Sequence, residues 1–325
     1  MLISLIWAVI VLATRLVSMI RKELSIEVSI RDVFEHTTIE ALGRHIDLQS
    51  QGVLVPAIVV QEKPDRIPLS FSQERLWFLD QLEGSVAYHM PTVLRLSGSL
   101  DVSVLEQTFH SIVDRHEVLR TMLRSADGVG YQEIIASDSW SLDHVRIAEG
   151  NSIEAVLSDY LEVPFDLSSD YKLRACIYDL GGDEYVLVCV FHHIASDGWS
   201  EDLLVSEFTA LYSALILGNT PDLPLLPLQY SDYAIWQRQY VEGEVLEDQL
   251  SYWEDRLSGV STLSLPTDYR RPSVQSHEGS SVSLELDAAL SASIHKVCQK
   301  EGVTLFMFLL SAFKVLLSRY SGQED

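Results

Sequence analysis

Residues 186–200, VLVCVFHHIASDGWS, contain the pattern that decides the fold. The stretch opens with six consecutive apolar residues, rich in β-branched types, a short way after the turn residues Gly181-Gly182-Asp183. A run of this kind, without alternating polar positions, predicts a strand that is buried on both faces. Apolar residues recur at helical spacing after Gly198, so we expect a helix that packs one face inward. That face consists of Leu204, Phe208, Leu211, Tyr212 and Leu215.

Two histidines and an aspartate come after this strand. Because successive strand residues point to opposite faces, only one of His192 and His193 can face a given cleft. A histidine at a strand end, with Asp197 nearby to fix its tautomer or hold the loop, suits a general base that works near neutral pH. A metal site of two histidines and an aspartate is an alternative, although adjacent strand histidines project apart. A purely structural pair is the third alternative, and the stretch alone leaves all three open.

The composition is that of an ordinary globular protein. The chain has 325 residues, 47% hydrophobic and 22% charged, which suggests about two domains with sizeable cores. Lys and Arg total 23 against 47 Asp and Glu, so the formal net charge is −24 and no nucleic-acid partner is expected. Cys176, Cys189 and Cys298 lie far apart in apolar or helical patterns. They predict buried thiols in a reducing compartment, the cytoplasm.

The amino-terminal residues are apolar enough to be mistaken for a membrane segment. Residues 1–14 are almost wholly apolar, but Arg15 and then Arg21-Lys22 interrupt them before the roughly 20 residues that a span needs. The basic region that a signal peptide places before its apolar core is missing. We therefore expect part of a buried amphipathic helix and no membrane partner. One face of this helix is formed by Leu12, Leu16, Met19 and Ile20.

A change of texture near Pro68 divides the chain. Residues 1–48 predict a small helical unit whose second helix, Ile39 to Ile46, opens with the capping box Thr37-x-x-Glu40. The residues between its two helices are expected to form a short loop. Residues 49–67 have no sustained period and contain prolines, so we interpret them as a linker.

Helical and strand patterns alternate after the linker. Helices are predicted from Ser70 to about Gly84, behind the box Ser103-x-x-Glu106, over 153–161 and over about 244–256. Strands are predicted over 92–96, 119–123, 131–135 and 173–178. Near the end, Ser281 to Leu286 alternate like a strand, and residues 288–300 are helical. Residues 304–320 predict a helix that is apolar nearly all round and needs burial on every side.

Four stretches, in one order along the chain, carry a family resemblance. They are Ser70-x-Ser72-Gln73-x-Arg75-Leu76-Trp77-x-Leu79, Arg115-His116-Glu117-x-Leu119-Arg120-Thr121, His192-His193-x-x-x-Asp197-Gly198-Trp199-Ser200 and Tyr230-x-Asp232-Tyr233-Ala234-x-Trp236-Gln237. With them, the sequence from about Ile67 onward resembles the condensation domain of a nonribosomal peptide synthetase. The resemblance implies a two-lobed α/β architecture like chloramphenicol acetyltransferase, with the active site in a tunnel between the lobes. Residues 68–275 would form the first lobe and residues 276–325 the incomplete start of the second.

Residues 11–48 are similar to the last part of a peptidyl carrier domain. The segment Leu12-Ala13-Thr14-Arg15-Leu16 matches the residues after the pantetheine-bearing serine in that family, and Ile10 stands where the serine would be. The resemblance therefore implies a truncated carrier remnant in residues 1–48 that cannot be phosphopantetheinylated at the usual place. No cofactor is expected to be bound covalently, and partner carrier domains would supply the 4′-phosphopantetheine arms.

The resemblance also implies a reaction and roles for the site residues. The amine of an aminoacyl thioester on an acceptor carrier would attack a thioester on a donor carrier and form an amide, with an adenylation domain adjacent. His193 would be the base or would orient the amine, while His192 and Asp197 would be structural. Asp197 would pair with Arg115 or Arg120, and Gly198 would let the backbone approach the thioester. Packing is the simpler role for Arg75, Trp77, Tyr233 and Trp236, and Glu117 is expected to be a solvated or salt-bridged charge at a helix end.

Two other functions remain open at this point, and so does the completeness of the chain. An ester-forming acyltransferase of the same His-x-x-x-Asp superfamily is one alternative, and a non-catalytic carrier-docking module is the other. The family's pattern also breaks after the second lobe has begun, near Ser281. We therefore expect a gene fragment or a partial chain, weak or inactive by itself.

Overall fold

The computed structural model describes residues 2–24, 26, 28–48, 55–84, 86–147, 152–273, 279–280 and 282–324. The chain forms two compact units. One combines Met1–Pro56 with Leu250–Asp325, and the other is Ala57–Gln249. This division follows contacts rather than family modules, so the domain limits drawn from the sequence remain predictions.

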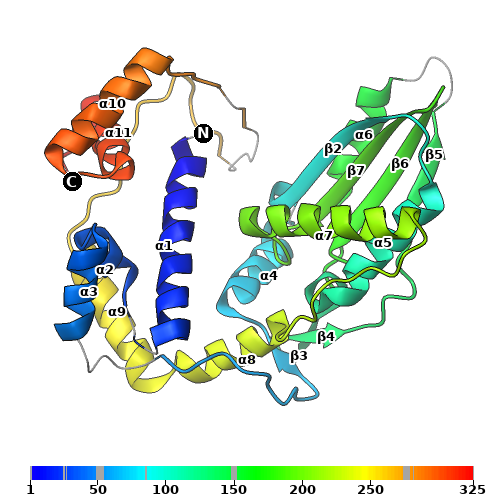
Figure 1. The fold of residues 1–325 in the computed structure, drawn as a ribbon, viewed down its shortest axis with the longest axis horizontal. Helices are drawn as coiled ribbons and strands as arrows, with labels where there is room; N and C mark the ends of the chain where they lie inside the picture. Colours follow the sequence, from blue (N-terminus) through cyan, green and yellow to red (C-terminus); the bar gives the residue numbers. More distant parts are fainter. Residues whose placement is uncertain are drawn as a thin grey trace. The chain divides into compact units, whose positions relative to one another are not determined.

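The unit of residues 57–249 is built on a four-stranded sheet with the order β2-β7-β6-β5 (Figure 1). The strands are β2 (His89–Ser97), β5 (Asp143–Arg146), β6 (Leu173–Gly181) and β7 (Glu184–His192). β7 pairs antiparallel with both of its neighbours, and β5 pairs parallel with β6. The apolar run at the centre of the sequence argument is therefore an inner strand, as predicted.

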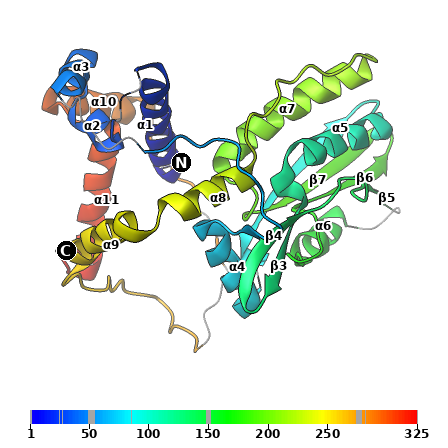
Figure 2. The same ribbon diagram turned by 90° about the horizontal axis from the view of Figure 1, so that it is seen from below.

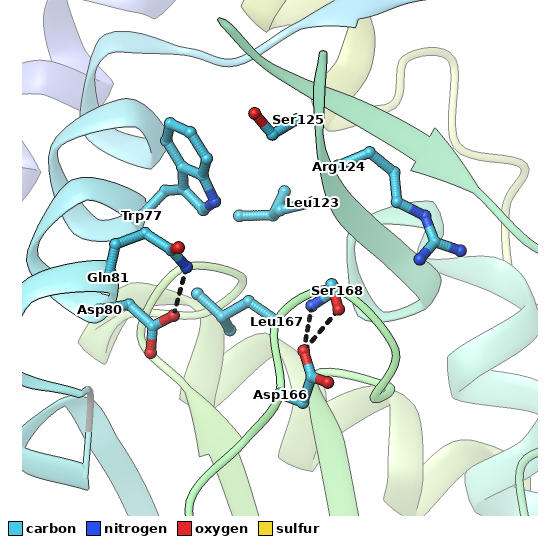
Figure 3. Close-up of a pocket in the computed structure, with 9 residues that line it drawn as sticks. All are labelled: Trp77, Asp80, Gln81, Leu123, Arg124, Ser125, Asp166, Leu167 and Ser168. Atoms are coloured by element: carbon cyan, nitrogen blue, oxygen red, sulfur yellow. Dashed lines mark hydrogen bonds between the residues drawn. The ribbon is translucent and has the colours of Figure 1, made fainter. Parts of the chain in front are cut away.

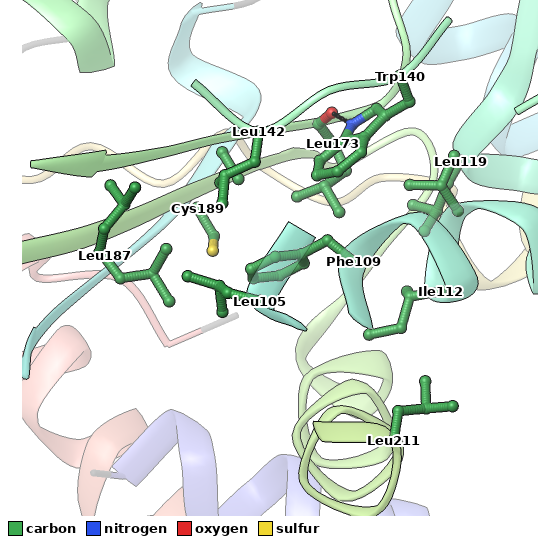
Figure 4. Packing of buried hydrophobic residues seen from close by; sticks show 13 residues of the cluster. Leu105, Phe109, Ile112, Leu119, Trp140, Leu142, Leu173, Leu187, Cys189 and Leu211 are labelled. Atoms are coloured by element: carbon green, nitrogen blue, oxygen red, sulfur yellow. Dashed lines mark hydrogen bonds between the residues drawn. The ribbon is translucent and has the colours of Figure 1, made fainter. Parts of the chain in front are cut away.

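The side chains of β7 enter two separate cores. Leu187 and Cys189 belong to a cluster with α5 (Val102–Arg115) and α7 (Gly198–Ile216), part of which Figure 4 shows. Val186, Val188 and Val190 belong to a second cluster, which includes residues of α6 (Ile153–Glu162) and α4 (Phe71–Glu83). Figure 2 shows α5 and α7 on one side of the sheet and α6 on the other. Because successive side chains of a strand point to opposite faces, a wholly apolar strand contributes side chains to both cores.

A second, three-stranded sheet has the order β1-β4-β3. Its strands are β1 (Ile67–Pro68), β3 (Thr121–Ala126) and β4 (Val129–Ile134). Asp127 and Gly128 form the β3–β4 turn, with φ values of 54° and 80°. Two successive positive φ angles are typical of the turn that joins twisted antiparallel strands. The remaining elements of this unit are the 3₁₀ helices Val86–Tyr88 and Glu117–Arg120 and the helix α8 (Tyr230–Tyr240).

The structure confirms the predicted start of one helix and corrects the starts of two others. Ser70 caps α4 in a capping box with Gln73, and Gly84 ends that helix, as expected. For α5 the predicted box at Ser103 is wrong, because the Asp101 carboxylate accepts the N–H groups of Ser103 and Val104. For α3 (Ile39–Leu48) the box at Thr37 is wrong by one residue, since the Thr38 hydroxyl accepts the Ala41 N–H at 3.1 Å.

The other unit is helical. Its elements include α1 (Leu2–Leu24), α2 (Ile30–Glu35), α3, α10 (Ala288–Glu301) and α11 (Leu305–Ser321), while α9 (Gly243–Leu257) begins before residue 250. Val28, Leu42 and Ile46 form a small core, against which Ile20 packs. The loop expected between the first two helices contains α2, capped by Ser29. The predicted burial of Leu12, Leu16 and Met19 is wrong, because α1 turns Ala13 inward and leaves these three exposed.

One prediction for the carboxy-terminal residues is also wrong. Residues 282–287 are not a strand in the described part of the chain, and Val282 is 96% exposed there, so the alternating pattern has no sheet to bury its apolar face. Helix α11 forms as predicted, and the apolar residues Phe313 and Leu316 on it are exposed in this structure.

Among the described residues, no single helix is both long and apolar enough to span a bilayer; α10 and α11 pass such a test only together, as a pair bent by 105°.

Candidate active site

The loop that leaves β7 is organised by His192. The backbone carbonyl of His192 accepts the Ala195 N–H at 2.9 Å, and its ring nitrogen Nδ1 accepts the Ile194 N–H at 3.0 Å. The next residue, His193, donates its backbone N–H to the Tyr88 carbonyl at 2.9 Å. These bonds turn the chain sharply at the strand end and fix the two imidazoles on opposite sides, as strand alternation predicts.

His192 points into the core. Its side chain is completely buried, with the Phe165 and His89 rings near it. Burial lowers the pKa of His192 to about 3, and the nearby His89, Lys172 and His193 contribute to this lowering. The imidazole is therefore neutral at physiological pH. Because Nδ1 accepts a hydrogen bond, the ring proton is assigned to Nε2.

His193 points outward and has the opposite tautomer. Its ring nitrogen Nδ1 lies 2.7 Å from the carbonyl oxygen of Ser196, and its side chain is exposed. A carbonyl oxygen only accepts hydrogen bonds, so the neutral ring carries its proton on Nδ1. The lone pair of Nε2 is left to accept a proton or a hydrogen bond from outside the protein.

Asp197 holds the start of α7. Its carboxylate accepts the backbone N–H groups of Trp199 and Ser200 at 3.1 and 2.9 Å, and the Ser200 hydroxyl at 2.7 Å. Such a cap satisfies helix donors that otherwise lack partners. The structural role assigned to Asp197 agrees with this geometry, but the predicted partner, Arg115 or Arg120, is wrong because both guanidinium groups bind elsewhere.

The two arginines bind groups that the sequence analysis did not single out. Arg115 donates from Nε to Glu207 at 3.1 Å, and His116 lies 2.7 Å from the same carboxylate. Glu207 is buried on the inward side of α7, so this network joins α7 to the end of α5. Arg120 donates to the backbone carbonyls of Asp114 and Ile135. The sequence did contain a signal for Glu207, because it is a single glutamate within the apolar face of the helix predicted after Gly198.

Other motif residues join the start of α4 to α8. The Ser70 hydroxyl bonds to the Tyr230 hydroxyl at 2.9 Å, and the Gln237 side chain accepts the Phe71 N–H at 3.0 Å. The rings of Tyr233 and Trp236 stack at 6.0 Å, as packing residues do.

Two motif carboxylates bind the segment before β1. Asp232 accepts the Gln61 N–H at 2.9 Å, and Glu117 pairs with Lys63 at 2.6 Å. The prediction of a salt-bridged Glu117 is thus confirmed. These bonds fasten the carboxy-terminal part of the predicted linker to α8 and to the 3₁₀ helix Glu117–Arg120.

Gly198 is the first residue of α7. A Cβ atom added to it would meet no other atom within 4 Å, so packing does not require glycine there. The contrast is Gly130 in β4, where an added Cβ would come within 2.7 Å of Leu69 Cδ1 and within 3.1 Å of Trp77 Cε3. Trp77 therefore packs on a strand glycine, whereas Arg75 is exposed.

A pocket of about 230 Å³ lies between α4, β3 and residues 166–168 (Figure 3). Its polar walls include Asp80, Arg124 and Asp166, and Trp77 is on the same wall as Asp80. None of the residues from His192 to Trp199 lines it, so it is separate from the candidate site. A tunnel between two lobes remains a prediction, because it would involve both units.

Metal binding has little support from the described side chains. No group of three or more His, Cys, Asp or Glu residues that could hold an ion occurs among them. His192 and His193 also point to opposite sides, which prevents them from sharing one.

Two substitutions distinguish a capping role of Asp197 from a role in an ion pair. We expect Asp197→Asn to keep the unfolding free energy within about 0.5 kcal/mol of the original, because an amide oxygen can accept the same N–H groups. Asp197→Ala should lose about 0.5–2 kcal/mol. Urea denaturation of both variants is the measurement, and an equal loss in both would contradict the capping role.

Burial of neutral His192 predicts a pH-dependent stability. Its folded-state pKa of about 3 lies below the value of about 6.5 in an unfolded chain. Between these values the unfolded state binds more protons, so the unfolding free energy should fall as pH falls below 6.5, by up to about 1.4 kcal/mol per unit from this residue. His192→Asn keeps an acceptor for the Ile194 N–H but does not titrate. Its urea midpoint should therefore change less between pH 6.5 and 4.5, and parallel profiles would refute the assignment.

Comparison with known proteins extends over almost the whole chain. Residues 63–325 match the condensation domain family, and residues 11–46 match the phosphopantetheine attachment site family. Relatives include a linear gramicidin synthase of Brevibacillus parabrevis, 41% identical, and a dimodular nonribosomal peptide synthase of Bacillus subtilis, 36% identical. Each alignment covers 97% of this chain but only 6% and 14% of the respective relative. The chain thus spans a small part of the length of these proteins.

Solved structures share this fold. The X-domain from teicoplanin biosynthesis, in a complex with OxyB, has a TM-score of 0.75 at 31% identity, over 83% of this chain and 60% of that chain. A condensation domain for chain release from the enacyloxin polyketide synthase has a TM-score of 0.61 at 23% identity, over 88% and 56%, and this likeness shows the fold alone. The predicted α/β fold of condensation domains is confirmed. The attachment-site match assigns the covalent cofactor, a 4′-phosphopantetheine arm, to the carrier. The chain belongs to the condensation domain family of nonribosomal peptide synthetases.

Proposed function

We propose that this chain forms an amide bond between two thioesters delivered by carrier domains, with His193 as the group that accepts the proton of the attacking amine. One observation carries the proposal: the exposed His193 ring is bonded through Nδ1 to the Ser196 carbonyl at 2.7 Å, so Nε2 is free to act as a base. Family membership supports the class of reaction, and the tautomer supports the role of this residue.

The proposed step balances without a further reactant. The amine nitrogen of the acceptor attacks the carbonyl carbon of the donor thioester, the C–N bond forms and the C–S bond breaks. The amine proton passes to Nε2 of His193 and then to the departing thiolate, which leaves as a thiol. While the ring is doubly protonated, the Ser196 carbonyl keeps accepting the Nδ1 proton and so stabilises the imidazolium.

Gly198 is proposed to approach the reacting carbonyl. It is the first residue of α7, where N–H groups carry partial positive charge, and the Asp197 carboxylate takes the next two N–H groups rather than that of Gly198. A donor in this place would favour the negative oxygen that develops during attack. The absence of a side chain would let the thioester come close to the backbone.

The proposed partners are a donor carrier, an acceptor carrier and an adjacent adenylation domain, as parts of a longer synthetase. Residues 11–46 belong to the carrier type, but Ile10 has no hydroxyl to form a phosphodiester. Its side chain lies outside the described part. We therefore propose that residues 1–48 are a carrier remnant and that both arms come from partner carriers. The free, buried cysteines are compatible with the proposed cytoplasmic location.

Replacement of His193 tests the proposal directly. With loaded donor and acceptor carriers, His193→Ala should lower the rate of amide formation about 10²- to 10⁴-fold, because a general base contributes about that much. His144→Ala, an exposed histidine on β5, is the matched control and should keep full turnover. Product is measured by mass spectrometry of the acceptor carrier.

Three outcomes would contradict the proposal. Unchanged turnover in His193→Ala would remove this residue from the chemistry. Ester formation from a free alcohol, with no amide product, would favour the ester-forming acyltransferase. Carrier binding without product, when the chain is part of the longer synthetase, would favour a docking module.

Gly198→Ala separates catalysis from folding at the start of α7. Because an added Cβ meets nothing within 4 Å and alanine favours helices, the unfolding free energy should not fall. Amide formation should fall about tenfold or more if the thioester needs that space. Ser206→Ala, at an exposed position of the same helix, should change neither quantity. Full turnover in Gly198→Ala would refute the proposed approach.

A further inference from the structure

Buried polar atoms without a protein partner concentrate around the Phe165 ring. Of the five such side-chain atoms in the described part of the chain, four belong to this neighbourhood: His89 Nε2, His192 Nε2, Arg174 Nε and Tyr160 Oη. The His89 and His192 rings lie 5.1 and 5.8 Å from Phe165, and the Arg174 guanidinium lies 4.6 Å above it. Buried polar groups in native proteins almost always have a partner, and ordered water often supplies it.

The two histidines are complementary in their hydrogen-bonding capacity. His89 donates from Nδ1 to the Leu161 carbonyl at 3.0 Å, so its Nε2 has a lone pair to offer. His192 accepts at Nδ1 from the Ile194 N–H, so its Nε2 has a proton to offer. Burial lowers the pKa of both rings, and the charge of Arg174 also lowers the pKa of His89. One buried donor and one buried acceptor therefore belong to directly opposed residues of the β2–β7 ladder.

The separation of the rings fits a bridge rather than a direct bond. Their centroids are 6.2 Å apart with planes at 70°, and neither Nε2 atom has a protein partner. Two hydrogen bonds of about 2.9 Å in series join nitrogen atoms at most about 5.8 Å apart, a separation that rings with centroids 6.2 Å apart can present. A water molecule can make both, since it donates to one nitrogen and accepts from the other.

We propose that His89 and His192 hold an internal water molecule between them, and that this water-linked pair positions the loop that presents His193. The water accepts a hydrogen bond from the Nε2–H group of His192 and donates a hydrogen bond to Nε2 of His89.

His89 and the neighbouring Arg174 connect the pair to the carboxy-terminal end of α6. The Leu161 carbonyl accepts from His89, and the carbonyls of Tyr160 and Val163 accept from Arg174 at 3.2 and 2.9 Å. On the other side of the pair, the His192 ring accepts the Ile194 N–H, within the turn that sets the direction of His193. A fixed His192 ring therefore fixes the turn, and His89 is a positioning residue that touches no substrate. This second half of the proposal depends on the proposed function, whereas the water site does not.

The ring proton of His192 is the first readout. In nitrogen-15 spectra of the full chain near pH 7, we expect a proton on Nε2 of His192 that exchanges slowly and shows cross-relaxation with a bound water. A proton on Nδ1, a charged ring or fast exchange would overturn the water site. A metal ion bound between the rings would also overturn it, because it would require a lone pair on Nε2.

Variants of His89 give the second readout. His89→Phe keeps a ring but removes both bonds, so the His192 ring proton should exchange about tenfold faster or more and lose its water signal. His89→Gln retains an amide that can donate and accept, and should restore much of the protection. His144→Phe, at an exposed position of β5, is the matched control and should leave the signal unchanged. Unchanged exchange in His89→Phe would overturn the pairing, and a His89→Phe chain that does not fold leaves the spectrum of the unaltered chain as the deciding measurement.

Amide formation then tests the positioning role. We expect kcat of His89→Phe to fall about 10- to 100-fold with KM nearly unchanged, because a small misplacement of a reacting group costs about that much, and His89→Gln to recover most of it. If the His192 ring proton exchanged faster in His89→Phe while kcat stayed unchanged, the positioning role would be rejected and the water site would stand. A failure of the proposed function would instead appear as loss of amide formation in the unaltered chain, with the spectra as predicted.

Discussion

The structure depends on the burial of β7 on both faces. Because each residue of this strand must enter one core or the other, a register shift by one residue would exchange Leu187 and Val188 between two packed clusters. The same alternation continues into the two histidines at its end. His192 falls on the face of Val188 and Val190 and becomes buried, so His193 has to point the other way. The core thus selects which imidazole can meet a substrate.

The two imidazoles differ in burial, in tautomer and in hydrogen-bond partner. The buried ring accepts a backbone N–H and stays neutral, so it shapes the turn. The exposed ring donates to a backbone carbonyl and keeps a basic nitrogen outward. Neither tautomer depends on a carboxylate, because Asp197 is occupied with the first turn of α7. Under the proposed function, His193 is the residue that acts, and His192 and Asp197 hold the loop around it.

Much of this was predictable from sequence, and the failures have physical reasons. Strand burial and the opposite directions of the histidines follow from periodicity, and the ends of α4 follow from Ser70 and Gly84. The arginine partners of Asp197 were not predictable, because Glu207 and backbone carbonyls compete for those guanidinium groups across the fold. His89 was missed as well, since its relation to His192 arises only from the pairing of β2 with β7. The false strand at 282–287 shows that alternation alone does not supply a neighbouring strand.

The most direct test of the central claim compares the two imidazoles in one spectrum. Long-range nitrogen-15 correlations of the histidine rings, with His192 and His193 identified by single substitutions, report the tautomer of each ring near pH 7. The account predicts opposite tautomers, with the proton on Nε2 in His192 and on Nδ1 in His193. The same tautomer in both rings, or a charged His192, would contradict it.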